Sequence, residues 1–364
     1  MKDISTRRSV LRRYIIITVL SVMATMPVAC GTPRRQAPAG PPSPVAEANN
    51  PASAGASQQP RAPADEAECE LWVTRDFGSF VIKRVTAPFS DGESVMEVLK
   101  RHCRVETAYG GGFVRSLDGL ASTRGRAAGG GDWFYYVDGV LAGRGALETS
   151  APAGGVVWWD YHAWSYGGGQ FLAVVGAWPR PFTGKSTILH TAGGAKAAQT
   201  IASALKDAGG PSPGRATDLA TTVSEYDGGP LAERSTPTML VGVAGKLLES
   251  EWVAGLFRNA WRAGMPGTIR APGHDGGLVG LDAAGKEVAR WAEGSGLIVA
   301  TASYMGDGNP LWIVAGWDEQ GLNRAAEALA GGLRSDSPLR YAFAVAVTPT
   351  NVERLPLGAG RGRN

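Results

Sequence analysis

A dense group of aromatic residues between Trp133 and Tyr166 constrains the fold more than any other feature of this sequence. Residues 133–137 read WFYYV and precede Asp138-Gly139, and residues 156–161 read VVWWDY after Gly154-Gly155. Aromatic and β-branched residues bounded by turn dipeptides are typical of β-strands. Because side chains alternate between the two faces of a strand, one face is expected to fill a core. The other face is either packed as well or forms a flat aromatic surface for a ligand or a partner.

The candidate ligand contacts lie on these two predicted strands and are Trp133, Tyr135, Trp159, Tyr161 and His162. Trp133 and Tyr135 share one face of their strand. His162 is included because it stands inside an aromatic strand. The alternative for each ring is an ordinary core position, and the alternative for His162 is a structural or solvent-facing role.

The segments before these strands complete a small α+β domain, predicted at residues 68–165. Residues 70–75 and 81–85 have strand composition on either side of Asp76-Phe77-Gly78, which predicts a hairpin. Ser94 then precedes apolar residues at helical spacing from Val95 to Leu99, which predicts a short amphipathic helix.

Four segments of this domain resemble the transcobalamin-like C-terminal domain family, a domain-of-unknown-function family related to the β-domain of cobalamin carriers. They are residues 91–99 (DGESVMEVL), 112–119 (GFVRSLDG), 133–139 (WFYYVDG) and 154–161 (GGVVWWDY). The resemblance implies a β-grasp-like pairing of one helix with a twisted sheet, and it implies a cobalamin-like corrinoid as the ligand. In the animal carriers this module closes over cobalamin that a separate helical barrel holds, and no segment here resembles that barrel. Many members have Asn in place of Asp138 and Gly-Asp in place of Gly154-Gly155.

Residues 166–350 are predicted to form a second domain, an α/β sandwich of unreadable role, because apolar strand-like runs alternate with helical patterns. The expected strands are 171–176, 239–243, 297–302, 311–316 and 341–347, the expected helices are 195–208, 248–263 and 320–333, and a hairpin is expected at 277–291 about Asp282 to Gly285. Residues 351–364 are predicted to be a disordered tail.

The N-terminus predicts export and a lipid anchor. Residues 1–29 combine a cationic start with a short apolar run, which indicates a signal peptide, and residues 28–31 (VACG) resemble a lipobox with Cys30 as the lipidated residue. The alternative is a plain secretory signal in which Cys30 is incidental. Residues 30–67 are rich in Pro, Ala and Gly, which predicts a disordered linker. The expected location is the extracytoplasmic face of the cell membrane.

Removal of the signal changes both the charge and the cysteine count. Residues 1–29 hold five of the 36 Lys and Arg and one of the 33 Asp and Glu, which leaves 31 basic and 32 acidic side chains. A nearly neutral chain gives no electrostatic reason to expect nucleic-acid binding. With Cys30 lipidated, Cys69 and Cys103 form an even pair outside the cytoplasm, which favours a disulfide over two buried thiols.

No set of catalytic or metal-ligating residues can be assembled from the sequence. Residues 179–186 (PRPFTGKS) end like a phosphate-binding loop, but Pro179 stands where that loop needs glycine. The four histidines lack metal-ligand spacing, and there is no Gly-x-Ser-x-Gly elbow. We therefore expect no enzyme, no resident cofactor and no metal.

The function that we predict is a membrane-anchored extracytoplasmic binding protein that captures a cobalamin-like ligand for uptake, with a transporter as a possible partner. The alternative is a cell-envelope interaction or adhesion module that binds a protein or a wall polymer through exposed aromatic side chains.

Overall fold

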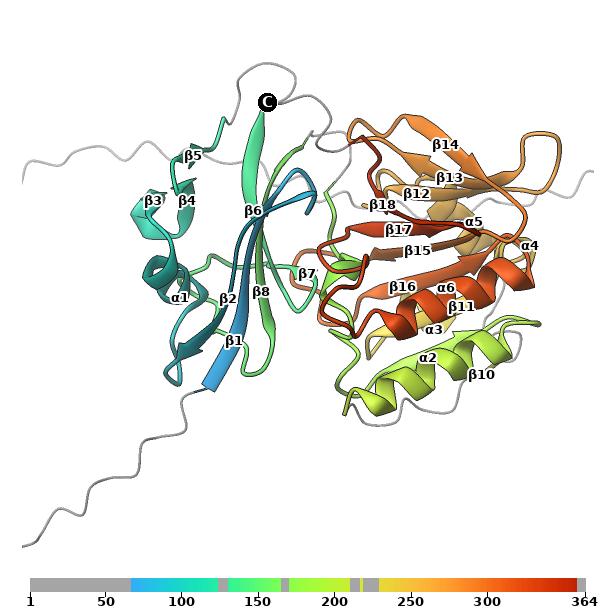
Figure 1. Cartoon of the computed structure of the whole chain (residues 1–364), viewed down its shortest axis with the longest axis horizontal. Helices are drawn as coiled ribbons and strands as arrows, with labels where there is room; N and C mark the ends of the chain where they lie inside the picture. The colour runs from blue at the N-terminus through green and yellow to red at the C-terminus, as the bar shows by residue number, and fades with distance from the viewer. Residues whose placement is uncertain (1–66, 124–129, 165–169, 210–216, 219–228, 359–364) are drawn as a thin grey trace, which may run out of the picture. The chain divides into compact units, whose positions relative to one another are not determined.

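The computed structural model describes residues 67–123, 130–164, 170–209, 217–218 and 229–358 (Figure 1). The predicted signal peptide, Cys30 and nearly all of the linker lie outside the described residues. The described elements mix helices with several β-sheets, which confirms the predicted α+β class.

A five-stranded sheet forms the centre of the first region, residues 67–164. Its strands, in the order β2-β1-β8-β6-β7, are β1 (Ala67–Arg75), β2 (Phe80–Phe89), β6 (Gly131–Val137), β7 (Val140–Leu141) and β8 (Val156–Ala163). β1 and β8 pair in parallel, and the other neighbours pair antiparallel. The predicted hairpin is present and turns at Asp76 to Ser79. The turn dipeptide Asp138-Gly139 joins β6 to β7 in a second hairpin, and its positive φ angles of 50° and 82° suit this dipeptide.

A single helix, α1 (Val95–His102), packs on one side of this sheet, as Figure 1 shows. It begins with a capping box, because Ser94 accepts a hydrogen bond from the Glu97 backbone N–H while the Glu97 side chain accepts one from that of Ser94. A small three-stranded sheet follows, composed of β3 (Val105–Ala108), β4 (Phe113–Leu117) and β5 (Leu120–Ala121), and the 3-10 turn η1 (Tyr109–Gly111) connects β3 to β4. The helix paired with a sheet agrees with the β-grasp-like expectation.

A seven-stranded mixed sheet forms the centre of the second region, residues 170–358. Its order is β10-β9-β11-β16-β15-β17-β18, and the strands are β9 (Thr187–His190), β10 (Thr217–Asp218), β11 (Thr238–Val243), β15 (Gly296–Thr301), β16 (Leu311–Gly316), β17 (Ala344–Val347) and β18 (Val352–Leu355). Its central strands are buried on both faces: in β16, Trp312 and Val314 enter one core cluster while Leu311 and Ile313 enter another. This burial explains the continuous apolar sequence of these strands.

Helices cover both faces of the seven-stranded sheet. Two helices, α2 (Ala195–Asp207) and α6 (Glu319–Gly331), lie side by side on one face (Figure 1). The other face is covered by α4 (Ala244–Leu247), α5 (Glu251–Arg258) and a three-stranded sheet of β12 (Gly267–Arg270), β13 (Gly277–Leu281) and β14 (Glu287–Trp291). The predicted α/β sandwich is therefore present, with α3 (Gly229–Ala232) as a further short turn of helix.

Three predicted elements of the second region are wrong. Residues 171–176 are no strand: they make one bridge, Ala173 to Val140, and then enter the 3-10 turn η2 (Val175–Ala177), because their backbone bonds to the β6–β7 hairpin and to Phe343. The helix predicted over 248–263 is only α5, because Ser250 caps its start and Asn259 ends it. The tail predicted to be disordered from 351 begins with β18, since Leu355 is buried and β18 pairs with β17.

The predicted disulfide between Cys69 and Cys103 is not formed. Both residues are free thiols buried in the core between α1 and the first sheet. Burial raises the pKa of each thiol to about 11. Because the thiolate is the species that reacts in disulfide exchange, this raised pKa disfavours the reactive form of both side chains at neutral pH.

Candidate functional site

The predicted ligand contacts lie mostly in the interior. Trp133, Trp159, Tyr161 and His162 are 5%, 3%, 7% and 2% exposed, and Tyr135 is half-buried. Trp133, Tyr135, Trp159 and Tyr161 pack together in the core beneath α1, whereas His162 lies on the opposite face of β8. The flat aromatic surface, one of the two alternatives that the sequence left open, is therefore not formed by these rings.

The second face of the first sheet is also buried, because the second region packs on it. Trp72, Tyr136 and Trp158 of the first sheet contact Tyr341 and Phe343 in a shared aromatic core. Gly78 in the β1–β2 turn approaches so closely that a Cβ there would lie 1.8 Å from the backbone O of Tyr341. Both faces of the aromatic strands thus serve packing, which is the alternative that the sequence left open.

A buried polar network, here called the Asp160 cluster, lies within this aromatic core. The Asp160 carboxylate accepts hydrogen bonds from the backbone N–H groups of Phe77 (3.1 Å) and Gly78 (2.8 Å) and from Thr74 Oγ1 (2.5 Å), and its Oδ1 lies 2.8 Å from His162 Nδ1. The His162 ring stacks on Phe134 at a centroid distance of 4.4 Å.

The Asp160 cluster resembles a catalytic triad only in composition. In a triad, the histidine lies between the hydroxyl nucleophile and the carboxylate. Here the carboxylate of Asp160 lies between Thr74 and His162, and Thr74 Oγ1 also accepts a hydrogen bond from Trp158 Nε1 at 2.7 Å. All three side chains are at most 2% exposed, so a substrate has no access to them. The cluster is an anchor for the β1–β2 turn.

A pocket of about 550 Å³ opens instead where the β6–β7 hairpin meets the loop at residues 303–308. This volume lies within the range of small-molecule sites. Val140 and Leu141 of β7 form an apolar wall of the pocket, and Tyr304 and Met305 of the loop form the opposite rim. These two rim side chains are 64% and 50% exposed. Exposed apolar groups beside a hollow are typical of a binding site rather than of a folded core.

The loop is seated directly on the hairpin. The Gly306 backbone N–H donates to Leu141 O at 2.7 Å. A Cβ on Gly143 would lie 2.4 Å from Met305 O, so only glycine allows this approach. The pocket therefore has a preformed rim made from segments that are about 160 residues apart in the sequence.

Asp138, Arg144 and Thr149 are polar residues of the pocket wall, and the Tyr135 hydroxyl contacts the last two from outside the lining. Asp138 Oδ1 accepts a hydrogen bond from the Val156 backbone N–H at 2.8 Å, and desolvation raises the pKa of this carboxyl although that hydrogen bond and Arg180 lower it. The Tyr135 hydroxyl donates to Arg144 O at 2.5 Å and lies 3.0 Å from Thr149 Oγ1. Tyr135 is thus the one predicted contact that supports the pocket wall. The exposed Arg144 guanidinium has no ion pair with any described residue.

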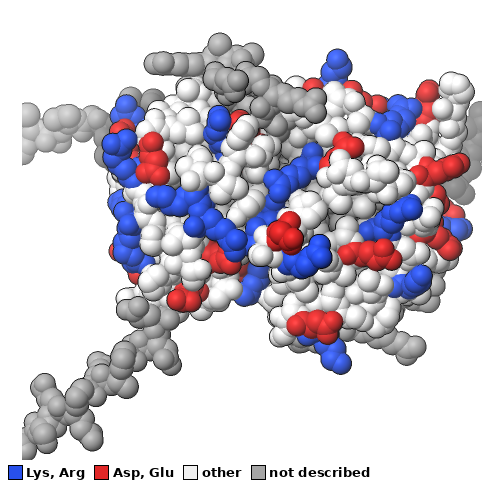
Figure 2. Space-filling model, viewed as in Figure 1, with Lys and Arg blue, Asp and Glu red and all other residues white. Residues whose placement is uncertain are grey.

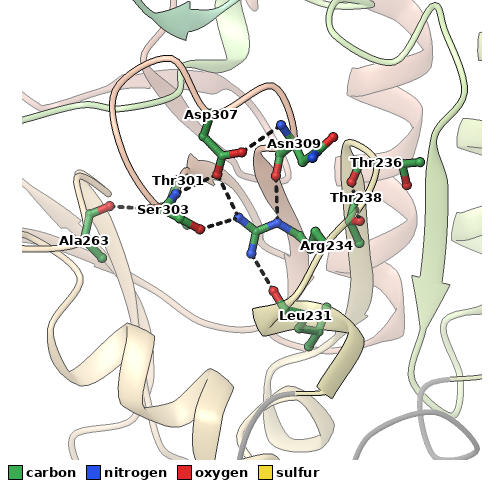
Figure 3. A network of polar contacts seen from close by, with 9 residues as sticks. All are labelled: Leu231, Arg234, Thr236, Thr238, Ala263, Thr301, Ser303, Asp307 and Asn309. Atoms are coloured by element: carbon green, nitrogen blue, oxygen red, sulfur yellow. Dashed lines mark hydrogen bonds and ion pairs between the residues drawn. The ribbon is translucent and has the colours of Figure 1, made fainter. Parts of the chain in front are cut away.

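A second buried network, here called the Arg234 cluster, holds the loop from behind (Figure 3). The Arg234 guanidinium donates to Leu231 O, to Asn309 O at 2.8 Å and to Ser303 Oγ at 3.2 Å, and it lies 3.4 Å from Asp307 Oδ2. Asp307 also accepts from the backbone N–H groups of Ser303 and Asn309, each at 2.9 Å. The two charged side chains are 5% and 6% exposed. Burial lowers the pKa of Arg234, and the Asp307 carboxylate opposes that shift.

The residues that form this pocket were not predicted from the sequence. Residues 303–310 read SYMGDGNP between two predicted strands, so an exposed Tyr-Met pair flanked by glycines marks a structured loop. That signal is present in the sequence, but the partner hairpin is not identified by it. Arg234 and Arg144 carry no motif at all.

Comparison with known protein families gives a match in the first region. Residues 92–163 match the model of a family described as Domain of unknown function (DUF4430), which covers most of the segments with the predicted resemblance. No curated protein matches the chain. A solved structure of a candidate metal-binding protein from Ruminococcus gnavus ATCC 29149 is 16% identical over 27% of this chain and 100% of that chain, with a TM-score of 0.22. The structure of haptocorrin in complex with Cbi is 11% identical over 27% of this chain, with a TM-score of 0.22, and the match spans 25% of haptocorrin.

Acidic and basic side chains are interspersed on the face shown in Figure 2, and neither sign covers it. In the described ranges, no group of three or more His, Cys, Asp or Glu side chains is arranged to hold a metal ion. No helix in the part of the chain that the structure describes is long and apolar enough to span a membrane.

Proposed function

We propose that the chain is a binding protein that captures a small ligand in the pocket between the β6–β7 hairpin and the loop at 303–308. The observation that carries this proposal is the preformed rim: Tyr304 and Met305 are exposed, yet the Arg234 cluster and the Gly306–Leu141 hydrogen bond fix the loop that bears them. A rim that is rigid before binding loses little conformational entropy when a ligand enters. The ligand would present an apolar body to Val140, Leu141 and Met305.

A cobalamin-like corrinoid stays the named ligand candidate, on the strength of the family resemblance of residues 91–161. The pocket offers an apolar wall and the Arg144 guanidinium, which has no ion pair with any described residue, and these two features match a large ring system with polar side groups. A corrinoid is larger than a drug-sized ligand, so this pocket would enclose one edge of it. Lipid anchoring through Cys30 at the extracytoplasmic face, with a transporter as recipient, completes the proposal. In this proposal the protein binds its ligand and catalyses no reaction on it.

The test is a titration of the full chain with cyanocobalamin, followed by quenching of tryptophan fluorescence. We expect saturable quenching with micromolar or tighter affinity. Gly308 lines the pocket, and a Cβ there would meet nothing within 4 Å, so Gly308→Phe should fold normally and fill the opening. This variant should abolish saturable quenching.

The matched control is Gly331→Phe, which also places a ring at a glycine with open space but lies at the exposed end of α6. It should bind as the parent chain does. Absence of saturable quenching by the parent chain would eliminate the corrinoid. Equal binding by both glycine variants would eliminate this pocket as its site.

An envelope-interaction module is the second candidate, and it now depends on different residues. Phe80, Val81 and Ile82 on the edge strand β2 are 41%, 50% and 40% exposed, whereas the aromatic side chains of β6 and β8 are largely buried. An exposed apolar edge strand can pair with a strand of a partner. Val81→Lys should abolish pull-down of an envelope protein if this candidate is correct, and should leave the cyanocobalamin titration unchanged.

A further inference from the structure

A second hollow, of about 630 Å³, lies in the second region at the end of α5, away from the pocket proposed above for the ligand. Its wall comes from residues 257–262, which begin with the last two residues of α5, from residues of β12 and β13, and from the start of β14 with the turn before it. All of these residues are described. None of them lines the first pocket.

The floor of this hollow is apolar and firmly held. Phe257, Ile269 and Leu281 are buried, at 3%, 5% and 4% exposure. The half-buried Trp261 is fixed from two sides. Its ring meets Phe171 edge-on at a centroid distance of 5.5 Å, and the Gly285 backbone lies so close that a Cβ there would be 2.6 Å from Trp261 Cδ2. A ligand in this hollow would therefore need an apolar body.

The rim carries an excess of positive charge. Three arginines line the hollow, Arg258, Arg262 and Arg270, against one carboxylate, Glu287. Glu287 is already shared by two guanidiniums, because Arg270 Nη2 contacts its Oε1 and Arg290 Nη2 lies 3.5 Å from its Oε2.

The remaining two arginines differ in their pairing. Arg258 pairs with Glu251 outside the hollow. Arg262 is exposed and has neither an ion pair nor a hydrogen bond with any described residue. One guanidinium at the rim is thus free to bind a carboxylate, sulfonate or phosphate group, for which its planar donors are suited.

We infer that this hollow is a second binding site, selective for an organic anion that has an apolar body and one acidic group. The body would lie against Ile269, Leu281 and Trp261, and the acidic group would pair with Arg262. This site is independent of the proposed ligand pocket, because the two share no lining residue.

The probe for the test is 8-anilino-1-naphthalenesulfonate, an aromatic sulfonate whose fluorescence rises in apolar surroundings. The full chain carries Gly308→Phe in every sample, so that the first pocket is closed. We expect a saturable rise in fluorescence that weakens with added salt. Arg262→Gln should weaken the affinity about tenfold, as expected for loss of a charge-assisted hydrogen bond. Arg262→Lys, which keeps the charge, should retain most of the affinity.

Two further variants keep the result unambiguous. Ala271 is exposed and lines the hollow, so Ala271→Phe should fold and block the probe completely. Arg144→Gln, at the other pocket, should have no effect. The inference is overturned by the absence of saturable binding, by unchanged affinity in Arg262→Gln, or by an equal loss in Arg144→Gln. Blocking by Ala271→Phe without any effect of Arg262→Gln would also overturn it, since the hollow would then bind apolar groups without regard to charge.

Discussion

The Asp160 cluster and the Arg234 cluster are built alike and serve different ends. Each has a buried aspartate that accepts hydrogen bonds from two backbone N–H groups of one turn. The donors are Phe77 and Gly78 for Asp160, and Ser303 and Asn309 for Asp307. The first turn is inserted into an aromatic core, whereas the second displays exposed side chains at the rim of a pocket. The same carboxylate geometry therefore fixes the packing of the molecule in one place and presents a binding surface in the other. The surroundings of a buried polar network, rather than its composition, indicate its role.

The largest expected effect is on the Asp160 cluster. Asp160→Ala leaves Thr74 Oγ1, two backbone N–H groups and His162 without their shared acceptor in a fully buried position. We expect the free energy of unfolding to fall by about 3–5 kcal/mol. Denaturant unfolding measures this. Amide hydrogen exchange at residues 303–309 should stay as in the parent chain below the unfolding transition. Faster exchange there would contradict the separation of the two clusters.

The next largest effect is expected in the Arg234 cluster. Arg234→Met keeps an apolar chain of similar length but removes every donor to Leu231 O, Asn309 O and Ser303 Oγ. Asp307 keeps its two backbone donors, so the expected loss in the free energy of unfolding is about 2–3 kcal/mol. Hydrogen exchange at the Gly306 amide should accelerate well before global unfolding.

Ligand binding separates the two substitutions further. Arg234→Met should weaken any ligand of the first pocket, because it loosens Tyr304 and Met305. A variant that is equally destabilised through the Asp160 cluster should bind normally once folded. If Arg234→Met binds as the parent chain does, the Arg234 cluster does not position the pocket rim.

A matched pair of threonine substitutions sharpens the comparison at a smaller scale. Thr74 Oγ1 donates to Asp160 and accepts from Trp158 Nε1, whereas Thr301 Oγ1 makes one hydrogen bond, to Ala263 O. Thr74→Val should lower the free energy of unfolding by about 2 kcal/mol and Thr301→Val by about 1 kcal/mol. The first substitution leaves two buried groups without a hydrogen bond, and the second leaves only one. Thermal denaturation of the two variants side by side measures the difference, and the reverse order would be evidence against this account.

The sequence predicts the elements of both regions better than it predicts what they touch. The aromatic and β-branched composition of 133–137 and 156–161, bounded by turn dipeptides, identified β6 and β8, and the capping residue Ser94 identified the start of α1. Periodicity reports which side chains share a face, but not what covers that face. The second face of the aromatic strands was therefore open to two interpretations, and contacts from Tyr341 and Phe343, some 180 residues away, settled it as core.

The candidate pocket was less predictable for the same reason. Its walls come from the β6–β7 hairpin and from residues 303–308, and neither segment has a composition that specifies the other. Asp160 illustrates the limit at a single residue. A carboxylate between Trp159 and Tyr161 resembles an outward-facing polar position, yet it is buried because the β1–β2 turn supplies its donors. Cys69 and Cys103 likewise form an even pair by count, while their burial was not readable from spacing.

The smallest expected effect concerns a third carboxylate, Asp138, which has one backbone donor instead of two. Its pKa is raised by desolvation, so the folded chain holds this proton more tightly than the unfolded chain does. The stability gained from protonation is fully present below the unfolded pKa, about 3.9, and is lost as the pH rises through the folded pKa.

Asp138→Asn removes that titration. The Asn amide oxygen can still accept a hydrogen bond from the Val156 backbone N–H, and Asn tolerates the φ of 50° at this turn. The variant should therefore be more stable than the parent chain at pH 7, by less than about 1 kcal/mol, and its advantage should shrink as the solution is acidified. Unfolding in denaturant at pH 7 and pH 4 measures both values. If the advantage instead grows at low pH, one backbone donor is enough to stabilise the ionised carboxylate of Asp138. The second backbone donor would then not be what distinguishes Asp160 and Asp307 from Asp138.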